Sequence, residues 1–544
     1  MSSKQQLEHL ELAKTDTSVL VEADLQKPSR PASPHDCVPS SSTSPTSAEE
    51  ASMPLAKAIA LYPKVVGYYL CLTLVVVGWG FDLAVIGSIT GVDAFKDDYG
   101  EIYGGATIIP ARWLAMWLAS TPMGMVLGSM SGGILQDRVG RRLSLTTGSI
   151  ILAVSVAIIF FSFLPTQIEG MRAMFFVGKV LQGYAVGILK VTAMTFISET
   201  APVALRGSSM ALFPAGTLFG QLVGAIVVFV VNKADSKPAY LGAFGSQWIL
   251  ALAPFVLSCV MPESPAYLEA KSQSDKAAQA AHRLYAPRVD PLPILERMRL
   301  TIAEEKAINE SVSYLSCFNM ENRRRTFIVI MVNLFPALFG LELVSKSSYF
   351  VQTLGMESST SLIFLIAGIV AGCVANGVGL YILSRVGRRP VSLISLSIAA
   401  ILWGVMGVAG FWKGAAVYWI ACGTMTTVII ACGMGVWPAA YAVMGEVSSL
   451  QMRSKTQAIG GVVQQGSSTV VSVILPYLFN PDAGNLGAKT GFLYVGTCIL
   501  AIVLTWFVLP EMKGRTAMEI DQMFNQNIAT RRFSSWQPDG RQSE

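Results

Sequence analysis

Long apolar runs constrain this chain more than any other feature. Runs of about twenty apolar residues recur along almost all of the 544-residue sequence. Each run is long enough to cross roughly 30 Å of hydrocarbon as an α-helix. Charged residues make up only 14% of the chain, whereas soluble domains carry about a quarter, so most of the surface must face something other than water. The sequence therefore predicts an all-α, multi-pass membrane protein embedded in a lipid bilayer.

The apolar runs define twelve expected spans in two groups of six. These spans lie near residues 65–90, 112–135, 144–164, 171–193, 208–231, 244–261, 326–350, 360–383, 391–411, 417–443, 456–478 and 490–509. The two halves are 61–261 and 326–510, and the polar, mixed-charge segment 262–325 between them predicts short linker helices. Residues 1–60 are rich in Ser, Pro and Thr, which predicts a disordered tail, and 511–544 form a second tail.

Basic residues gather in alternate short loops, and this sets the expected orientation. The loops contain Arg138, Arg141, Arg142, Arg206, Arg388, Arg389 and Arg453. Cytosolic loops of membrane proteins carry an excess of Lys and Arg, so both termini and the segment 262–325 are expected in the cytosol. We expect a chain of this type in the plasma membrane.

Two loop motifs occur twice in the same register. DRVGRR at Asp137–Arg142 recurs as SRVGRR at Ser384–Arg389, and SETAPVALRG at Ser198–Gly207 recurs as GEVSSLQMRSK at Gly445–Lys455. Gly140 and Gly387, Glu199 and Glu446, and Arg206 and Arg453 are each 247 positions apart. Such a repeat predicts a parallel duplication of a six-span unit, with a substrate site between the halves near the middle of the membrane.

These motifs resemble those of the major facilitator superfamily and, within it, the sugar porter family, over about residues 65–515. GGILQDRVGRR, SETAPVALRG, PESPAYL (262–268) and PEMKGRT (510–516) resemble four loop signatures of that family, in the correct order. The first span, GFDLAVIGSITG, looks like that of fungal hexose and α-glucoside proton symporters. The resemblance implies the twelve-helix fold of this superfamily and transport of a small molecule together with protons.

Other function classes find little support in the sequence. All three histidines lie outside the expected spans, the cysteines are scattered, and no phosphate-binding loop or metal-ligand cluster appears. The basic residues sit in short clusters, which does not suggest nucleic-acid binding. We therefore expect a monomeric protein that is not an enzyme and has no cofactor and no metal.

The repeated loop charges are candidates for gating. Arg and Glu at helix ends form charge-assisted hydrogen bonds and offset the helix dipoles. We expect Glu199 to pair with Arg138, Arg141 and Arg142, and Glu446 with Arg388 and Arg389, which would latch each half in the outward-open state. The wider candidate set adds Asp137, Arg206 and Arg453. The alternative is that these charges only set the topology.

Asp82 is a charge deep inside the first span, and charges within spans are functional candidates because burying them is costly. The resemblance places it at the proton-coupling aspartate of sugar symporters. Its expected partner is Lys179 of the fourth span, where the family usually has Arg. Lys can lose its proton when buried, which Arg practically cannot. The alternative is a structural ion pair in a transporter without proton coupling.

Further charges within spans are candidates for substrate binding. Lys190 lies about three helical turns beyond Lys179, so if Lys179 faces a cavity, Lys190 should face it too. Glu342 and Lys346 are four residues apart and can pair on one helix face. By resemblance, this span usually carries two glutamines and an asparagine for sugar hydroxyls, whereas here Pro336–Ala337 and Glu342 occupy those positions.

Polar and aromatic side chains on other spans complete the candidate binding set. They are Gln221, Trp437, Tyr441, Gln464 and Gln465. Amides can both donate to and accept from hydroxyls, and an aromatic ring can stack on the apolar face of a sugar. The alternatives are helix packing for the rings and interhelical hydrogen bonds for the glutamines.

The leading hypothesis is proton-coupled uptake of a hexose, an oligosaccharide or another polyhydroxylated solute. A second hypothesis keeps the fold and changes the cargo to a charged or secondary metabolite, such as an organic acid or an exported toxin. Glu342, Lys346 and Lys190 favour it. A third is a nutrient sensor that does not transport, which the short segment after Pro510 disfavours.

Overall fold

The computed structural model describes residues 55–233, 239–309, 314–320, 322–448, 453–513 and 517–533, with positions 53, 515 and 536. They belong to one compact unit, residues 44–544. Most of the predicted disordered tail, 1–60, lies outside the described residues. The last residues of this segment are helical and belong to α3 (Leu55–Leu61).

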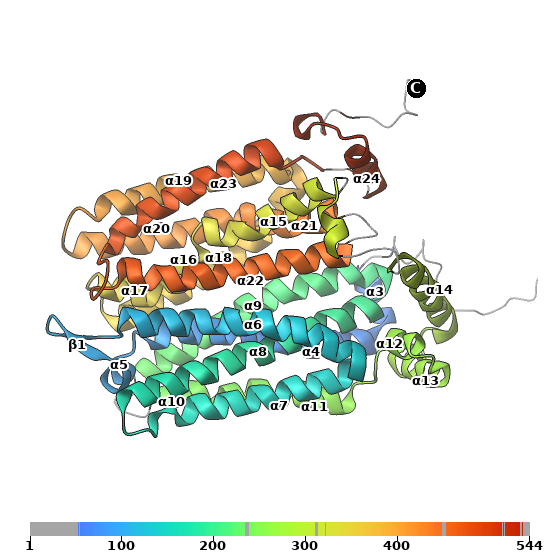
Figure 1. The fold of residues 1–544 in the computed structure, drawn as a ribbon, viewed down its shortest axis with the longest axis horizontal. Coiled ribbons are helices and arrows are strands. Elements are labelled where there is room, and N and C mark those ends of the chain that lie inside the picture. The colour runs from blue at the N-terminus through green and yellow to red at the C-terminus, as the bar shows by residue number, and fades with distance from the viewer. Residues whose placement is uncertain are drawn as a thin grey trace, which may run out of the picture. The chain divides into compact units, whose positions relative to one another are not determined.

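The first half consists of six spans that pack side by side (Figure 1). They are α4 (Pro63–Ile89), α6 (Ala111–Val139), α7 (Arg141–Phe160), α8 (Ile168–Thr200), α9 (Val203–Asn232), and α10 (Ala239–Gly245) followed by α11 (Gln247–Val260). The order and number agree with the prediction. Several helices are longer than their apolar runs, because their polar ends continue the helix beyond the hydrocarbon region.

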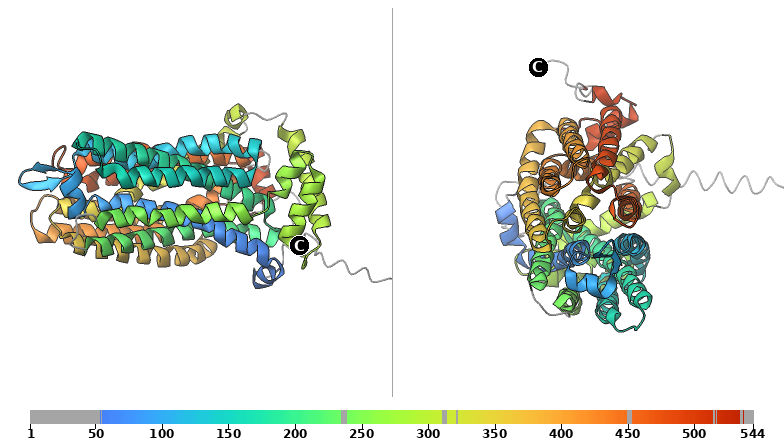
Figure 2. Two further views of the ribbon diagram at one scale, coloured as in Figure 1. Left: turned by 90° about the horizontal axis from the view of Figure 1, so that it is seen from below. Right: turned by 90° about the vertical axis from the view of Figure 1, so that its left-hand side faces the viewer.

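The second half repeats this arrangement, and Figure 2 shows the two halves as neighbouring bundles. Its spans are α15 (Arg323–Leu338) with α16 (Leu341–Ser345) and α17 (Ser347–Thr353), α18 (Ser358–Val386), α19 (Arg388–Ala409), α20 (Ala415–Met434) with α21 (Val436–Val447), α22 (Arg453–Phe479) and α23 (Gly491–Val508).

Two spans of the second half are broken where continuous helices were predicted. The seventh breaks after α15 at Gly340, whose φ of +92° is left-handed and favours glycine. The tenth breaks at Gly435, where a β-carbon would lie 2.4 Å from the β-carbon of Ser395. The hydroxyl of Ser395 accepts the amide of Val436 at 2.9 Å, which satisfies a group that the break exposes. Both breaks lie next to the central cavity described below.

The helices identify a multi-pass membrane protein. Among the described residues, ten helical segments are long and apolar enough to cross a membrane. The other two expected spans are α6, which is 29 residues long but rich in Gly and Ser, and the broken α15–α17. The all-α fold of twelve spans is therefore as predicted.

The two ends of the bundle carry different elements, and we name them accordingly (Figure 1). The linker end carries three helices of segment 262–325, α12 (Pro265–Ala270), α13 (Ser274–Tyr285) and α14 (Pro291–Asn309). The hairpin end carries α5 (Asp93–Tyr99), β1 (Glu101–Tyr103) and β2 (Ala106–Ile108).

The antiparallel hairpin of β1 and β2 was not predicted. Its register pairs Ile102 with Thr107, and Gly104 and Gly105 form the two-residue turn with positive φ values. A Gly-Gly pair between short strands favours such a turn, so the signal was present in the sequence.

Part of the C-terminal tail packs on the second half. Residues Ala517–Asn525 form α24, and Thr530–Arg532 form a short 3-10 helix. Arg325, at the start of α15, pairs with Asp521 of α24, and Arg324 donates to the carbonyl of Ile528 at 2.6 Å. The predicted tail 511–544 is therefore ordered in part.

Glycines allow close helix contacts within the first half. A β-carbon at Gly128 of α6 would lie 2.0 Å from the carbonyl oxygen of Tyr184 on α8. A β-carbon at Gly220 of α9 would lie 2.1 Å from the carbonyl oxygen of Val77 on α4. Small residues at such crossings bring the backbones together and increase van der Waals packing between membrane helices.

This packing predicts different outcomes for two glycines of α6. Gly128→Ala should destabilise the protein by about 1–3 kcal/mol, because the backbones of α6 and α8 must separate. Gly133→Ala is the matched control, since its β-carbon meets nothing within 4 Å and the change improves helix propensity. Thermal unfolding in detergent measures both variants. Equal melting temperatures would contradict the packing argument.

Candidate functional site

A large cavity lies between the two halves. It encloses about 1560 Å³ of empty space, including the space at its mouth. Helices α4, α6 and α9 of the first half and α15–α18 and α20–α22 of the second contribute its wall. Because both halves supply the wall, a solute bound here would contact both.

Five of the predicted substrate residues line this cavity. They are Gln221 on α9, Trp437 and Tyr441 on α21, and Gln464 and Gln465 on α22. Within the described part of the chain, these five side chains make no hydrogen bond, so their donors and acceptors can serve a solute.

Glu342 also lines the cavity, whereas Lys346 lies behind it. The ammonium of Lys346 is 2.8 Å from the Glu342 carboxylate and donates to the hydroxyl of Ser472 at 2.9 Å. Ser468 and Ser472 of α22 both donate to the carboxylate. The predicted pairing on one helix face is therefore observed. The predicted placement of Lys346 in the cavity is not observed. Lys346 and Glu342 form hydrogen bonds with the serines of α22 instead.

Lys179 and Lys190 were expected on one helix face, and neither residue lines the cavity. The predicted substrate residue Lys190 therefore does not form part of the wall. The ammonium of Lys190 lies 4.0 Å from the ring centroid of Trp79, and it is Trp79 that forms part of the wall. Lys190 therefore contacts the cavity through an aromatic ring that attracts its charge.

Much of the remaining wall is apolar. Pro336 and Ala337 line it at the positions where the resemblance would place glutamines. Other apolar lining residues include Leu83, Pro122, Met125, Leu218, Phe364, Leu365, Ile369 and Met425. The amide groups among the lining residues lie at Gln221 on α9 and at Gln464 and Gln465 on α22, and hydroxyl groups such as those of Thr217, Ser361 and Thr426 line the wall elsewhere.

A buried ion pair lies beside the cavity within the first half. The ammonium of Lys179 contacts the carboxylate of Asp82, and the two residues are only 2% and 1% exposed. Lys179 also donates to the Gln182 side chain at 2.7 Å. Gln182 donates to Gln247 at 2.5 Å, and Gln247 lies 3.4 Å from the same Asp82 carboxylate. The pair is thus enclosed in a ring of hydrogen bonds from α4, α8 and α11.

One residue separates this ion pair from the central cavity. The hydroxyl of Thr121 on α6 is 3.4 Å from the Asp82 carboxylate, and Thr121 itself lines the cavity. On another side, Gln182 and Gln247 line a second, smaller cavity. The roles of Thr121, Gln182 and Gln247 were not predicted. Gln182 stands three residues after Lys179, a spacing that places both side chains on one helix face.

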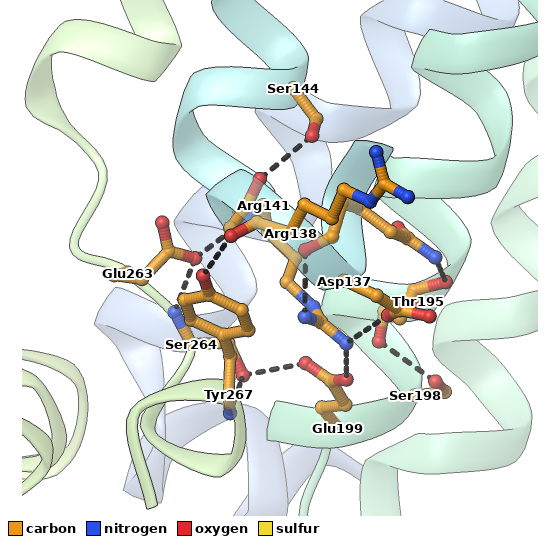
Figure 3. Close-up of polar contacts among 12 residues, drawn as sticks. Asp137, Arg138, Arg141, Ser144, Thr195, Ser198, Glu199, Glu263, Ser264 and Tyr267 are labelled. Atoms are coloured by element: carbon orange, nitrogen blue, oxygen red, sulfur yellow. Dashed lines mark hydrogen bonds and ion pairs between the residues drawn. The ribbon is translucent and has the colours of Figure 1, made fainter. Parts of the chain in front are cut away.

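At the linker end of the first half, Arg141 and Glu199 form an ion pair of 2.5 Å (Figure 3). The Glu199 carboxylate also accepts the hydroxyl of Ser264 at 2.6 Å, and Asp137 lies 3.6 Å from Arg141. Glu263 accepts the backbone amide of Arg141 at 2.8 Å, at the first turn of α7. A carboxylate at this place offsets the helix dipole and satisfies a free amide.

The second half repeats this network. Arg388 binds both oxygens of Glu446, at 2.6 and 3.2 Å. Glu511 accepts the backbone amides of Arg388 and Arg389, at 3.2 and 3.0 Å, at the start of α19. The correspondence extends to Gly387, which like Gly140 has a positive φ. The duplication therefore extends from sequence to hydrogen bonds.

Some predicted partners do not meet. The guanidinium of Arg142 donates to the carbonyls of Ser258 and Cys259, and that of Arg389 to the carbonyl of Trp506. Each of these two arginines therefore binds the end of a neighbouring helix instead of Glu199 or Glu446. The backbone carbonyl of Arg138 accepts the Tyr267 hydroxyl at 3.0 Å. Within the described residues, Arg138 makes no ion pair with Glu199. The side chains of Arg206 and Arg453 lie outside the described residues.

Glu263 and Glu511 are part of these networks but were not among the predicted site residues. Their signal was present, because both follow proline in the motifs PESPAYL and PEMKGRT. They are 248 positions apart, one more than the other repeated residues, so they fall outside the exact register of 247 positions.

The hairpin end joins the two halves. Asn480 donates to the carbonyl of Ile109 at 2.9 Å, and Asp482 accepts the amide of Ala111 at 2.8 Å. The cavity wall on that side is buried, with Val351 1% exposed. Tyr441, nearer the linker end, is 41% exposed. The two halves are therefore joined at the hairpin end, and we infer that the cavity opens toward the linker end.

Comparisons with known proteins agree with this architecture. Residues 70–524 match the family described as "Sugar (and other) transporter", so the chain belongs to that family of major facilitator transporters. It is 30% identical to the MFS transporter fmqE of Aspergillus fumigatus, over 84% of this chain and 85% of that protein. It is 27% identical to the maltose permease MAL61 of Saccharomyces cerevisiae, over 90% and 80% of the two chains.

Solved structures show the same fold. The partially occluded inward-open xylose transporter XylE from E. coli superposes with a TM-score of 0.69 at 20% identity, over 84% of this chain and all of that one. An inward-open structure of XylE gives a TM-score of 0.67. The family match over residues 70–524 and the similarity to fungal transporters confirm the predicted membership in the sugar porter group of the major facilitator superfamily, and the solved structures agree in fold.

The ion pair of the second half predicts a charge-swap result. Glu446→Arg should lower stability by about 1.5–3 kcal/mol, because it removes a bidentate hydrogen-bonded pair. Combining it with Arg388→Glu should restore part of that loss. Thermal unfolding of the two single variants and the double variant gives the coupling energy. Strictly additive effects would mean that the pair contributes nothing.

Proposed function

We propose that this transporter moves a polyhydroxylated solute, such as a hexose or an oligosaccharide, inward together with protons. The observation that carries the proposal is the buried pair of Asp82 and Lys179, one hydroxyl away from the central cavity. A carboxylate at that place can take up a proton from the cavity. Once protonated, Asp82 no longer holds the charge of Lys179, so the ring of hydrogen bonds around it must rearrange.

The proposed cycle is a rocking of the two halves about the central site. We infer that the linker end, where the cavity opens in this state, lies in the cytosol together with both termini, because cytosolic loops carry an excess of basic residues. Reaching the outward-facing state requires breaking the bonds at the hairpin end, such as Asn480 to Ile109. The ion pairs of Glu199 with Arg141 and of Glu446 with Arg388 each lie within one half, so they can keep that half rigid while it moves. We place the protein in the plasma membrane as a monomer.

The free hydrogen-bonding groups support a polyhydroxylated solute. Gln221 comes from the first half and Gln464 and Gln465 from the second, so one solute with several hydroxyls can bond to both halves. Trp437 and Tyr441 offer aromatic faces for the apolar side of a sugar ring. The named relatives include maltose and α-glucoside permeases.

A second candidate is a charged or less hydroxylated metabolite, moved by the same fold. Glu342 in the wall and the apolar surface around Pro336 and Ala337 favour it. However, Glu342 is neutralised by Lys346 and accepts two serine hydroxyls, so its charge is already satisfied. For this reason we prefer the polyhydroxylated solute. Solute flux in vesicles would also separate both candidates from a sensor that does not transport.

The coupling proposal predicts the behaviour of Asp82→Asn. This variant mimics a permanently protonated carrier, so uphill accumulation driven by a pH gradient should fall to background while exchange of internal and external solute continues. Asp97→Asn, at an exposed carboxylate of α5, is the control and should accumulate solute normally. Proteoliposomes with and without a pH gradient provide the measurement. Undiminished uphill transport by Asp82→Asn would remove the residue from the mechanism.

The substrate proposal predicts different effects at two positions of the cavity wall. Gln464→Ala should weaken binding of a hydroxylated solute by about 1–3 kcal/mol, or roughly 5- to 150-fold in Kd, because solute hydroxyls lose their partner. Glu342→Gln combined with Lys346→Gln removes both charges of the pair and should leave the preference between neutral and charged solutes unchanged. A solute panel in exchange assays checks both predictions. A switch in charge preference with the double variant would favour the second candidate.

A further inference from the structure

A groove runs along the membrane-facing surface between α4 and α11. It is lined by apolar side chains such as Leu74, Ile249 and Val256, of which Ile249 is 72% exposed. Gly67 leaves the space open, because a β-carbon there would meet nothing within 4 Å. The groove is separate from the central cavity, with which it shares no lining residue.

The length of the groove matches one leaflet of a bilayer. On α4 it extends from Lys64 to Leu74, and on α11 from Ile249 to Val260. At 1.5 Å per residue, both stretches cover about 15 Å. The hydrocarbon core is roughly 30 Å thick, so an acyl chain of one leaflet has about this length.

Cations surround the linker end of the groove. Lys64 lines it and donates to the carbonyl of Ala286 at 2.7 Å, while Arg283 donates to the carbonyl of Val260 at 3.0 Å. Arg288 bonds to the carbonyl of Ala60 on α3.

The charges of these cations are not neutralised by the contacts they make. Their partners are uncharged carbonyl groups, and all three side chains are exposed. Asp290, two residues after Arg288, accepts the backbone amide of Leu292, and none of the three cations forms an ion pair with a carboxylate among the described residues. The end of the groove therefore presents positive charge to whatever molecule lies in it.

We propose that this groove binds an anionic phospholipid. One acyl chain lies along α4 and α11, and the phosphate and any further acidic group of the headgroup lie against Lys64 and Arg283. Basic pockets at the membrane surface recognise acidic headgroups in this way. A peptide is a poor occupant, because its backbone groups would face hydrocarbon without partners.

A bound headgroup would bridge two parts of the protein. Lys64 belongs to α4, whereas Arg283 and the Ala286 carbonyl belong to α13 and the residue that follows it. The lipid therefore holds the linker helices against the first half. This role is independent of the transported solute and of proton coupling.

Lipid retention tests the proposal. The full chain is incorporated into nanodiscs of phosphatidylcholine and phosphatidylserine, extracted in mild detergent, and its bound lipid is measured by native mass spectrometry. Lys64→Ala and Arg283→Ala should each reduce retained phosphatidylserine about fivefold. Gly67→Phe fills the groove and should displace the lipid whatever its headgroup.

Matched controls come from the same chain. Lys276→Ala removes an exposed cation of α13 that makes no contact with the groove within the described residues, and Gly423→Phe places a ring at an exposed glycine of α20. Both should retain phosphatidylserine like the parent. The proposal is overturned if the groove variants retain as much phosphatidylserine as these controls, which would mean ordinary boundary lipid only. Arg283→Ala lies outside the spans, so it remains informative if Lys64→Ala folds poorly.

Discussion

A charge placed within the hydrocarbon must find a partner, and this constraint organises the centre of the molecule. Asp82 and Lys179 satisfy one another in the first half, and Glu342 and Lys346 do so in the second. Both pairs gain further hydrogen bonds from side chains of neighbouring helices. The pairs differ in their relation to the cavity. Asp82 is shielded by Thr121, whereas Glu342 is part of the wall. This difference is why we assign coupling to the first pair and a structural role to the second.

The linker end, outside the hydrocarbon, repeats one arrangement of charged residues in both halves. Each half begins its third helix at a glycine with positive φ, and there a glutamate covers the free amides while a neighbouring arginine binds a second glutamate. A β-carbon at Gly140 would lie 2.5 Å from the Glu263 carboxylate, and one at Gly387 would lie 2.6 Å from that of Glu511. Glycine is therefore required for the carboxylate to approach the helix. This geometry explains why glycine and glutamate belong to one repeated unit.

The sequence predicted the spans, the duplication and six of the eight candidate binding residues that line the cavity, because each depends on a local pattern. Apolar length specifies a span, and the repeat identifies equivalent residues. What the sequence did not show depends on geometry between helices. The break at Gly340, the ring of Gln182 and Gln247 around the ion pair, and the place of Lys190 behind Trp79 all arise from packing that no spacing along one helix encodes. Lys346 is an example. Its pairing with Glu342 on one helix face was predicted correctly, but the spacing did not show that Lys346 lies against α22 and not in the cavity.

Proton movement driven by solute tests the central claim most directly. Proteoliposomes that contain the purified protein and an internal pH indicator are mixed with a solute gradient and no initial pH difference. The account predicts that solute entry acidifies the interior in proportion to the solute transported. Solute entry without any change of internal pH would contradict it, because Asp82 would then carry no proton through the cycle.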